Sequence, residues 1–240
     1  MYSQKNWSIL LYCPYQTTNL RKKSRKRLAW ALERWNWSIA KWRKIMWSDE
    51  STFSQFSQGR SFRIWQTPEE EFDTSCLSAI VRHSPTWMFW RCFSWSGLGP
   101  LVPIRESMTG KVYSKVLQKH AIPSLHRLVG CRGTFQEDNA PPHRAKIAAD
   151  FRKSAGISVL PWPAQSPDLN PIENLWNEVD RKVCNLRNQP KNIDDLERKV
   201  KIAWHSISLD YIHKLIESMP HRIQACIEAQ GGATKYWYFK

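Results

Sequence analysis

From residue 42 onward, the order of apolar and polar residues is typical of β-strands. "WRKIMWSDES" (42–51) is an apolar and aromatic run that ends in polar residues, "SFRIW" (61–65) is a short alternating run, and "TWMFWRCFSW" (86–95) is longer and rich in aromatic residues. "SGLGP" (96–100) then predicts a turn, and "LVPI" (101–104) predicts the returning strand of a hairpin. This part of the chain therefore predicts the antiparallel start of a sheet.

The pattern changes after residue 110, where helices and strands are predicted to alternate. Residues 112–128 carry a helical apolar stripe that Pro123 interrupts, and residues 133–143 predict a short strand closed by a turn. Residues 144–156 predict a helix that ends at Gly156, and "ISVL" (157–160) predicts another strand. Strands that alternate with helices pair in parallel through crossovers, so this part predicts a parallel half of the same sheet.

The C-terminal third predicts helices only. Apolar residues recur at spacings of three and four in 172–183 and again in 192–207, which gives each helix one apolar face. Residues 211–232 predict one or two further helices with a break at Pro220. The fold class predicted is therefore α/β, with a mixed sheet, flanking helices and a helical C-terminal tail.

Charge makes nucleic acid the first candidate for a partner. The 240 residues contain 36 Lys and Arg against 21 Asp and Glu, a net charge of +15, which favours an extended polyanion over a small neutral ligand. Six of the seven residues of "RKKSRKR" are basic, and they are predicted to contact DNA: Arg21, Lys22, Lys23, Arg25, Lys26 and Arg27. Such a run is also typical of a nuclear-import signal, and an ordinary solvated helix start explains it equally well.

Cysteine usage and hydropathy argue against several other classes of protein. The six cysteines form no C-x-x-C pair, which argues against a zinc site and against a disulfide framework. The only apolar patch near the N-terminus is too short for a signal peptide, and no window approaches the ~20 apolar residues of a membrane span. We therefore expect an intracellular protein with no membrane partner, and we expect most of its fourteen tryptophans to lie in the core.

Three carboxylates at the ends of predicted elements are candidates for metal-dependent chemistry. Asp49 is predicted to close the first strand, Asp138 to close a later one, and Glu173 to lie just inside a helix. Ligands of open α/β sheets bind beyond the carboxyl ends of parallel strands, and carboxylate oxygens favour Mg²⁺ or Mn²⁺. With the third acid, two ions ~3.5 to 4 Å apart could promote an in-line phosphoryl displacement.

Each acid also has a structural explanation. Glu50 is as good a candidate as Asp49 on composition, and it faces the other side of the strand. Glu137 is the alternative candidate to Asp138. Asp138 itself begins a sequence that is typical of a tight turn. With Asn170 as helix cap and Pro171 in the first position, Glu173 would occupy the third position, where a capping box favours glutamate.

Five segments together resemble the mariner superfamily of DNA transposases: "WSDES", "WRCFSWSGLGPL", "EDNAPPH", "LPWPAQSPDLNPIENLW" and "LIESMPHRIQACIEAQGGATKY". Their order and spacing are similar to those of the branch whose third acid is glutamate, and the 34 residues between Asp138 and Glu173 match the interval of that branch. The resemblance covers roughly residues 25–236. It implies an RNase H-like fold in which Asp49, Asp138 and Glu173 bind two Mg²⁺ ions, with Mn²⁺ as a substitute. Asn139 and His143 would be supporting residues.

The resemblance also implies a function. The family cuts double-stranded DNA at the ends of its element and joins the freed 3′ hydroxyl to a target, which would take place in the nucleus and could involve a homodimer. Residues 1–41 are similar to the end of a linker to a helix-turn-helix domain, and residues 42–240 to the catalytic domain. Arg91 departs from the family, which generally has glycine there. The alternative is a truncated or domesticated remnant that binds DNA non-specifically without catalysis.

Overall fold

The computed structural model describes residues 14–54, 86–186, 188 and 190–236, and side chains from residue 21 onward. Its centre is a mixed five-stranded sheet in the order β3-β2-β1-β4-β5. The strands are β1 (Ile45–Ser54), β2 (Thr86–Ser94), β3 (Gly97–Ile104), β4 (Thr134–Gln136) and β5 (Ser158–Val159). The strands β1, β2 and β3 pair in antiparallel fashion, whereas β4 and β5 run parallel to β1, so both predicted halves of the sheet are confirmed. The strand expected at 61–65 lies outside the described residues.

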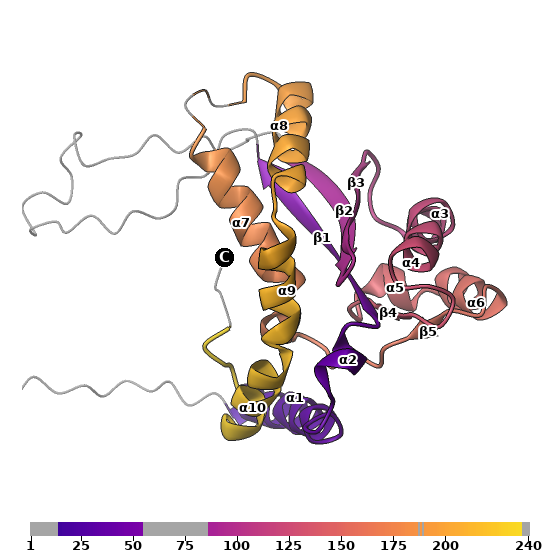
Figure 1. Cartoon of the computed structure of the whole chain (residues 1–240). Coiled ribbons are helices and arrows are strands. Elements are labelled where there is room, and N and C mark those ends of the chain that lie inside the picture. The colour runs from indigo at the N-terminus through magenta and orange to yellow at the C-terminus, as the bar shows by residue number, and fades with distance from the viewer. Residues whose placement is uncertain (1–13, 55–85, 187, 189, 237–240) are drawn as a thin grey trace, which may run out of the picture.

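Helices cover both faces of the sheet (Figure 1). One face carries α3 (Gly110–Val116), α4 (Ile122–Leu128), α5 (Pro141–Arg144) and α6 (Lys146–Ser154). The other carries α7 (Ile172–Cys184), α8 (Ile193–His205) and α9 (Leu209–Glu217). The remaining helices are α1 (Pro14–Leu32), α2 (Ile39–Trp42), α10 (Met219–Glu228), the π-helical turn η1 (Leu117–Ala121) and the 3-10 turn η2 (Pro167–Leu169). No helix in these ranges is both long and apolar enough to span a bilayer.

Large aromatic side chains fill the space between the sheet and α7 to α9. Trp47 of β1 and Trp176 of α7 are buried there, and Trp204 of α8 is fully buried as well. The opposite face has its own buried cluster, which includes Met46, Trp90 and Phe135. The prediction that most tryptophans are core residues is confirmed for the described ranges.

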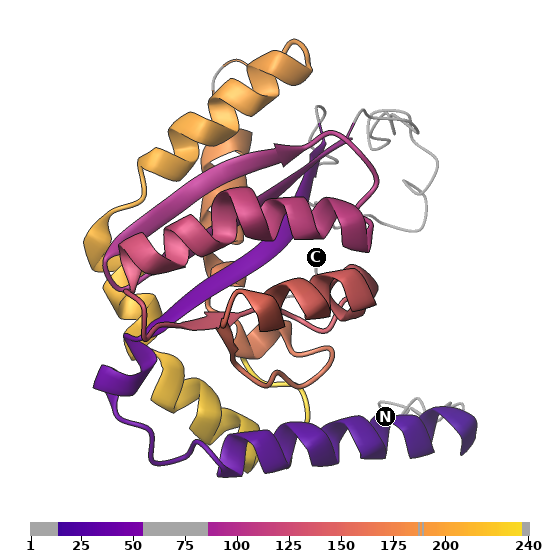
Figure 2. The same cartoon turned by 90° about the vertical axis from the view of Figure 1, so that its right-hand side faces the viewer.

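The N-terminal helix α1 is part of this core. Trp30 is buried, and its ring centroid lies 4.9 Å from that of Trp162. Arg27 is buried too, in an ion pair with Asp168. Figure 2 shows α1 lying beside α10 at one end of the sheet. The predicted boundary at residue 41 therefore does not coincide with a gap in packing.

Pro220 and Pro123, where the sequence predicted a break and an interruption, both lie in the first turn of a helix. Pro220 lies in the first turn of α10, which starts one residue after the break at Ser218, as predicted. Pro123 lies in the first turn of α4, directly after the π-helical turn η1. Proline lacks the N–H that a continuous α-helix would use, and a π turn is one way to continue the helical path past it.

Candidate active site

Asp49 and Asp138 occupy equivalent positions on the two central parallel strands. The last residues that pair between β1 and β4 are Trp47 and Gln136, and each acid follows its strand's last paired residue by two positions. The prediction that Asp49 closes its strand is wrong, because β1 continues to Ser54 through its antiparallel pairing with β2. Asp49 is nevertheless at the edge of the parallel pairing, where ligands of such sheets bind.

Asp49 is fixed from the side of α7. Its Oδ2 accepts a hydrogen bond of 2.8 Å from Nε1 of Trp176. Glu173 lies three residues before Trp176 on the same helix, so the two side chains project from the same side of α7. Since Trp176 reaches β1, Glu173 is brought to the same face of the sheet as Asp49.

The loop before α7 sets the position of Glu173. The helix was predicted to begin at Pro171, with Asn170 as its cap. It begins one residue later, at Ile172, and Pro171 is in the cap position. Asn170 still caps the helix start, because its Oδ1 accepts from the N–H of Ile172 at 3.3 Å. Glu173 is therefore in the first turn, where the helix dipole favours an ionised carboxylate.

Arg91 is the nearest cation to this pair of acids by strand register. It lies directly opposite Asp49 in the β1–β2 pairing, so the two side chains project from the same face of the sheet. It is fully buried, and within the described ranges none of its guanidinium nitrogens has a hydrogen-bond partner. Burial lowers the pKa of Arg91 well below its ordinary value, while the charges of Asp49 and Glu173 raise it. The pairing of β2 with β3 changes register between Arg91 and Phe93.

Asp138 is organised by a second cation, His143 of α5. Nδ1 of His143 lies 2.7 Å from Oδ1 of Asp138, and its Nε2 lies 3.3 Å from Oε1 of Glu50. Burial lowers the pKa of His143, but the hydrogen bonds with Asp138 and Glu50 outweigh it and raise the pKa to about 11. Burial also raises the pKa of Asp138, yet the hydrogen bonds from His143 and from the N–H of Ala140 hold it below its ordinary value. His143 is therefore protonated between two carboxylates.

The environments of Glu137 and Asp138 distinguish these two alternative candidates. Glu137 is buried, and its carboxylate accepts from Tyr113 Oη at 2.5 Å and pairs with Arg152 at 3.1 Å. Asp138 instead leaves 46% of its side chain exposed. Asn139, the other predicted supporting residue, donates its Nδ2 to the carbonyl of Trp162. Of these three, only Asp138 presents an accessible carboxylate.

The donor chemistry of the three acids fits a hard divalent cation. Asp49, Asp138 and Glu173 offer carboxylate oxygens, which Mg²⁺ and Mn²⁺ prefer, and Mg²⁺ usually takes only one or two of them from a protein. In the described part of the chain no three His, Cys, Asp or Glu side chains are close enough to hold one ion together. Asp49 is engaged with Trp176, and Asp138 with His143. The acids therefore match the metal in kind, and Asp138 keeps an accessible carboxylate while it accepts from His143.

The predicted DNA-contacting cations of α1 divide into two groups. Arg21, Lys22, Arg25 and Lys26 are exposed, and Lys23 is partly buried beside Gln165. Arg27 is only 4% exposed, and its guanidinium binds both carboxylate oxygens of Asp168. Arg27 therefore belongs to the interior of the fold, because the packing of α1 turns this one position inward. Asp168 is its fully buried partner.

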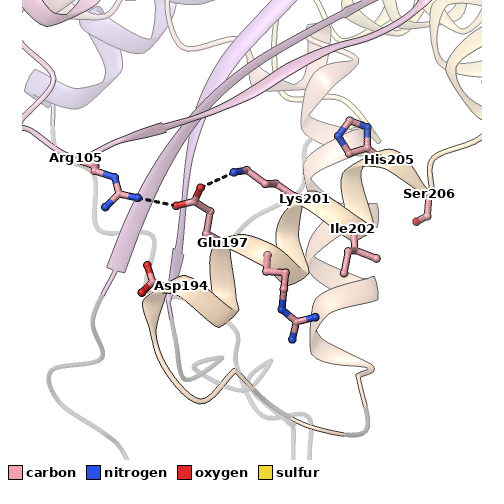
Figure 3. Close-up of a pocket in the computed structure, with 8 residues that line it drawn as sticks. Arg105, Asp194, Glu197, Lys201, Ile202, His205 and Ser206 are labelled. Carbon is pink, nitrogen blue, oxygen red and sulfur yellow. Dashed lines mark hydrogen bonds and ion pairs between the residues drawn. The ribbon is translucent and has the colours of Figure 1, made fainter.

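A surface pocket of about 670 Å³ lies away from these acids, beside α8 (Figure 3). Glu197 accepts from Arg105 at 3.1 Å and from Lys201 at 2.6 Å. Both hydrogen bonds are drawn in Figure 3. None of the three candidate acids lines this pocket. Its cations are already paired with acids, so we assign the candidate chemistry to the sheet edge instead.

Several features of the site have little or no signal in the sequence. The spacing of three between Glu173 and Trp176 could have indicated a shared helix face, but not that Trp176 binds Asp49. The two carboxylates that meet at His143 come from β1 and from the end of β4, and only the tertiary structure brings Glu50 to Asp138. Arg91 was noted as unusual, but its pairing with Asp49 depends on strand register.

The strand order, the mixed pairing and the acids at the edge of the parallel strands define an RNase H-like fold with a carboxylate site. A family model described as "DDE superfamily endonuclease" matches residues 44–197. The chain belongs to this superfamily, within the Tc1/mariner family of transposases. It is therefore a homologue of transposase catalytic domains, of the polynucleotidyl transferase and endonuclease class.

Relatives and solved structures agree with this assignment. The Tc1 transposase of Caenorhabditis elegans is 35% identical over 225 residues, which cover 93% of this chain and 82% of the relative. The Tcb2 transposase of Caenorhabditis briggsae is also 35% identical, over 227 residues and the same shares of both chains. The structure of the Mos1 transposase paired-end complex with left transposon end has a TM-score of 0.73 at 17% identity, covering 98% of this chain and 68% of that one. The Mos1 catalytic domain with raltegravir and Mg has a TM-score of 0.64 at 18% identity, covering 92% and 98%. These structures support the RNase H-like fold with its helical C-terminal region.

Proposed function

We propose that this chain cleaves phosphodiester bonds of duplex DNA and joins the freed 3′ end to a target, with Asp49, Asp138 and Glu173 as the catalytic acids. The observation that carries the proposal is the position of Asp49 and Asp138, each two residues past the last pair of the central parallel strands. Glu173 is held on the same side as Asp49 by the bond from Trp176 to Asp49. Phosphoryl transfer of this kind depends mainly on positioning and charge stabilisation, which three fixed acids around divalent ions can supply.

The three acids would hold two divalent ions, Mg²⁺ or Mn²⁺. Bound there, the ions would activate the attacking oxygen and stabilise the leaving oxygen of an in-line displacement. The Mos1 catalytic domain has been solved with Mg and with Mn, which supports a divalent requirement in a protein of the same fold. The protein's own contribution is to orient the acids: Trp176 fixes Asp49, Asn170 fixes the start of α7, and His143 holds Asp138.

Nicking of supercoiled plasmid in Mg²⁺ or Mn²⁺ tests the proposal. Asp138→Asn is expected to lower the nicking rate by about 100-fold or more, since metal-assisted charge stabilisation contributes several kcal/mol. Asp150→Asn is the matched control, because Asp150 is an exposed aspartate of α6 and is not one of the candidate acids. Equal nicking by the wild-type chain and by Asp138→Asn would refute the assignment.

The proposed partner is double-stranded DNA, both at element ends and at the target, in the nucleus. The net charge of +15 and the exposed cations of α1 support DNA binding. Solved Mos1 structures of a paired-end complex with a transposon end and of a strand transfer complex support the same substrate class, and a homodimer is part of the proposal. Sedimentation with and without a DNA duplex tests the dimer. Imaging of a fluorescent fusion with the exposed Arg21, Lys22, Arg25 and Lys26 intact or replaced by alanine tests nuclear entry. A monomer in both sedimentation conditions, or equal nuclear signal from both fusions, would contradict these two proposals.

A further inference from the structure

Arg91 places a fixed positive charge inside the candidate metal site. It is opposite Asp49 in the strand pairing, and it is fully buried on the face where α7 presents Glu173. The charges of both acids act on it, and they favour its protonated form. Burial lowers the pKa of Arg91, but an arginine starts from so high an intrinsic pKa that the side chain keeps its proton. The site therefore contains a permanent cation before any metal is bound.

The environment of Arg91 offers few other partners. Within the described ranges its guanidinium nitrogens make no hydrogen bond, so neither backbone carbonyls nor side-chain oxygens compensate its charge directly. Its guanidinium lies against the ring of Trp176 and 4.6 Å from the ring centroid of Trp204. Aromatic faces attract a buried cation, but a buried charge without hydrogen bonds still depends on nearby opposite charge. Asp49 and Glu173 supply that charge.

The two carboxylates Asp49 and Glu173 depend on Arg91 in turn. Two carboxylates brought together at low dielectric repel each other unless a cation lies between or beside them. A divalent metal would relieve this repulsion in the proposed function, and Arg91 already relieves part of it. A metal ion that binds these acids must also approach a fixed positive charge of the same sign.

We propose that Arg91 acts as an internal counter-charge for Asp49 and Glu173, which stabilises the metal-free site and weakens its affinity for divalent cations. This inference rests on the proposed function, since it takes Asp49 and Glu173 as metal ligands. Arg91 acts on the metal through these acids and is a positioning and affinity-setting residue. The concentration of divalent cation that this chain needs would then depend on a side chain that does not bind the metal.

Titration of Mn²⁺ by calorimetry into the folded chain tests the proposal without any DNA. Arg91→Met keeps the length of the side chain and removes its charge, and it is expected to tighten Mn²⁺ binding by about tenfold or more. Arg91→Lys keeps the charge and is the matched control, expected to bind Mn²⁺ as weakly as the wild type. Equal affinity of Arg91→Met and the wild type, equal tightening by both variants, or no binding by any of them would overturn the proposal.

A second measurement tests the proposal without the Arg91→Met variant, in case that variant does not fold. Asp49→Asn keeps an oxygen that can accept from Trp176 and removes only the charge. In the wild-type background it is expected to lower the thermal midpoint in metal-free buffer, because Arg91 loses its cross-strand counter-charge. A raised midpoint would mean that repulsion between carboxylates dominates, and it would refute the role of Arg91. The proposed function fails separately, when Asp138→Asn leaves plasmid nicking unchanged.

Discussion

The indole N–H of Trp176 donates a hydrogen bond of 2.8 Å to Oδ2 of Asp49. This contact joins α7 to β1, and so it joins the element that carries Glu173 to the strand that carries Asp49. A hydrogen bond to a charged group in a buried setting contributes about 1.5 to 3 kcal/mol. The bond therefore holds the helix that carries Glu173 against the strand that carries Asp49.

Trp176→Phe removes this donor and keeps an aromatic ring. We expect the rate of metal-dependent nicking to fall by about tenfold or more, because Asp49 loses the bond that orients it. The comparison is Trp204→Phe, since Trp204 is equally buried and its N–H binds the carbonyl of Gly99 at 3.0 Å instead. Both variants should lose similar thermal stability. Equal nicking rates for the two would show that Trp176 acts only through packing.

His143 should make stability depend on pH in the alkaline range. Its pKa is raised from 6.5 to about 11 in the fold, so its stabilising contribution is complete below pH 6.5 and is lost as the pH rises toward 11. Asp138 has a lowered pKa, so its share is present above its ordinary value of 3.8 and is lost as the pH falls through the folded value. We expect His143→Gln to be less stable than the wild type near neutral pH, and the difference should shrink toward pH 11. Urea unfolding of both proteins from pH 6 to pH 10.5 measures it, and a difference independent of pH would exclude the charged histidine.

The buried pair of Arg27 and Asp168 should matter for stability. The two residues are 4% and 0% exposed, and Arg27 also donates to the carbonyls of Gly231 and Gly232. Arg27→Met leaves Asp168 with an uncompensated buried charge, which typically costs about 3 to 5 kcal/mol in the free energy of unfolding. Lys26→Met on the same helix is exposed and should change stability little. Denaturant unfolding measures both, and a loss below about 1 kcal/mol for Arg27→Met would contradict the role of the ion pair in the fold.

The neighbouring exposed cations should matter for DNA instead. Replacing Arg25 and Lys26 with alanine together should weaken binding to any duplex and lower the slope of log affinity against log salt by about 2, if each cation contacts one phosphate. Fluorescence anisotropy at several salt concentrations measures the slope. A matched double replacement of exposed Lys153 and Lys146 on α6 provides the comparison. If both double variants lose the same slope, α1 has no special part in DNA binding.

Much of the fold follows from local sequence. The aromatic-rich run of β2, the apolar stripes of α7 and α8 and the break at Pro220 are short-range patterns, and each gave the observed type of element. The change from antiparallel to parallel pairing was also predictable, because helices separate the later strands. Asp49 was misplaced at a strand end because the polar residues after it pair with a strand distant in the sequence.

The sequence by itself determined the class of fold and the basic character of the N-terminal helix, and it supplied the three candidate acids with the interval between the last two. Only the tertiary structure decided which cation each acid meets: Arg91 opposite Asp49, His143 between Asp138 and Glu50, and Arg27 on Asp168. Composition and periodicity are properties of residues that are close together in the chain, so the sequence alone is enough to recognise them. The pairing of charges depends on strand register and on which helix face is buried, and these are set by packing between segments that lie far apart in the chain.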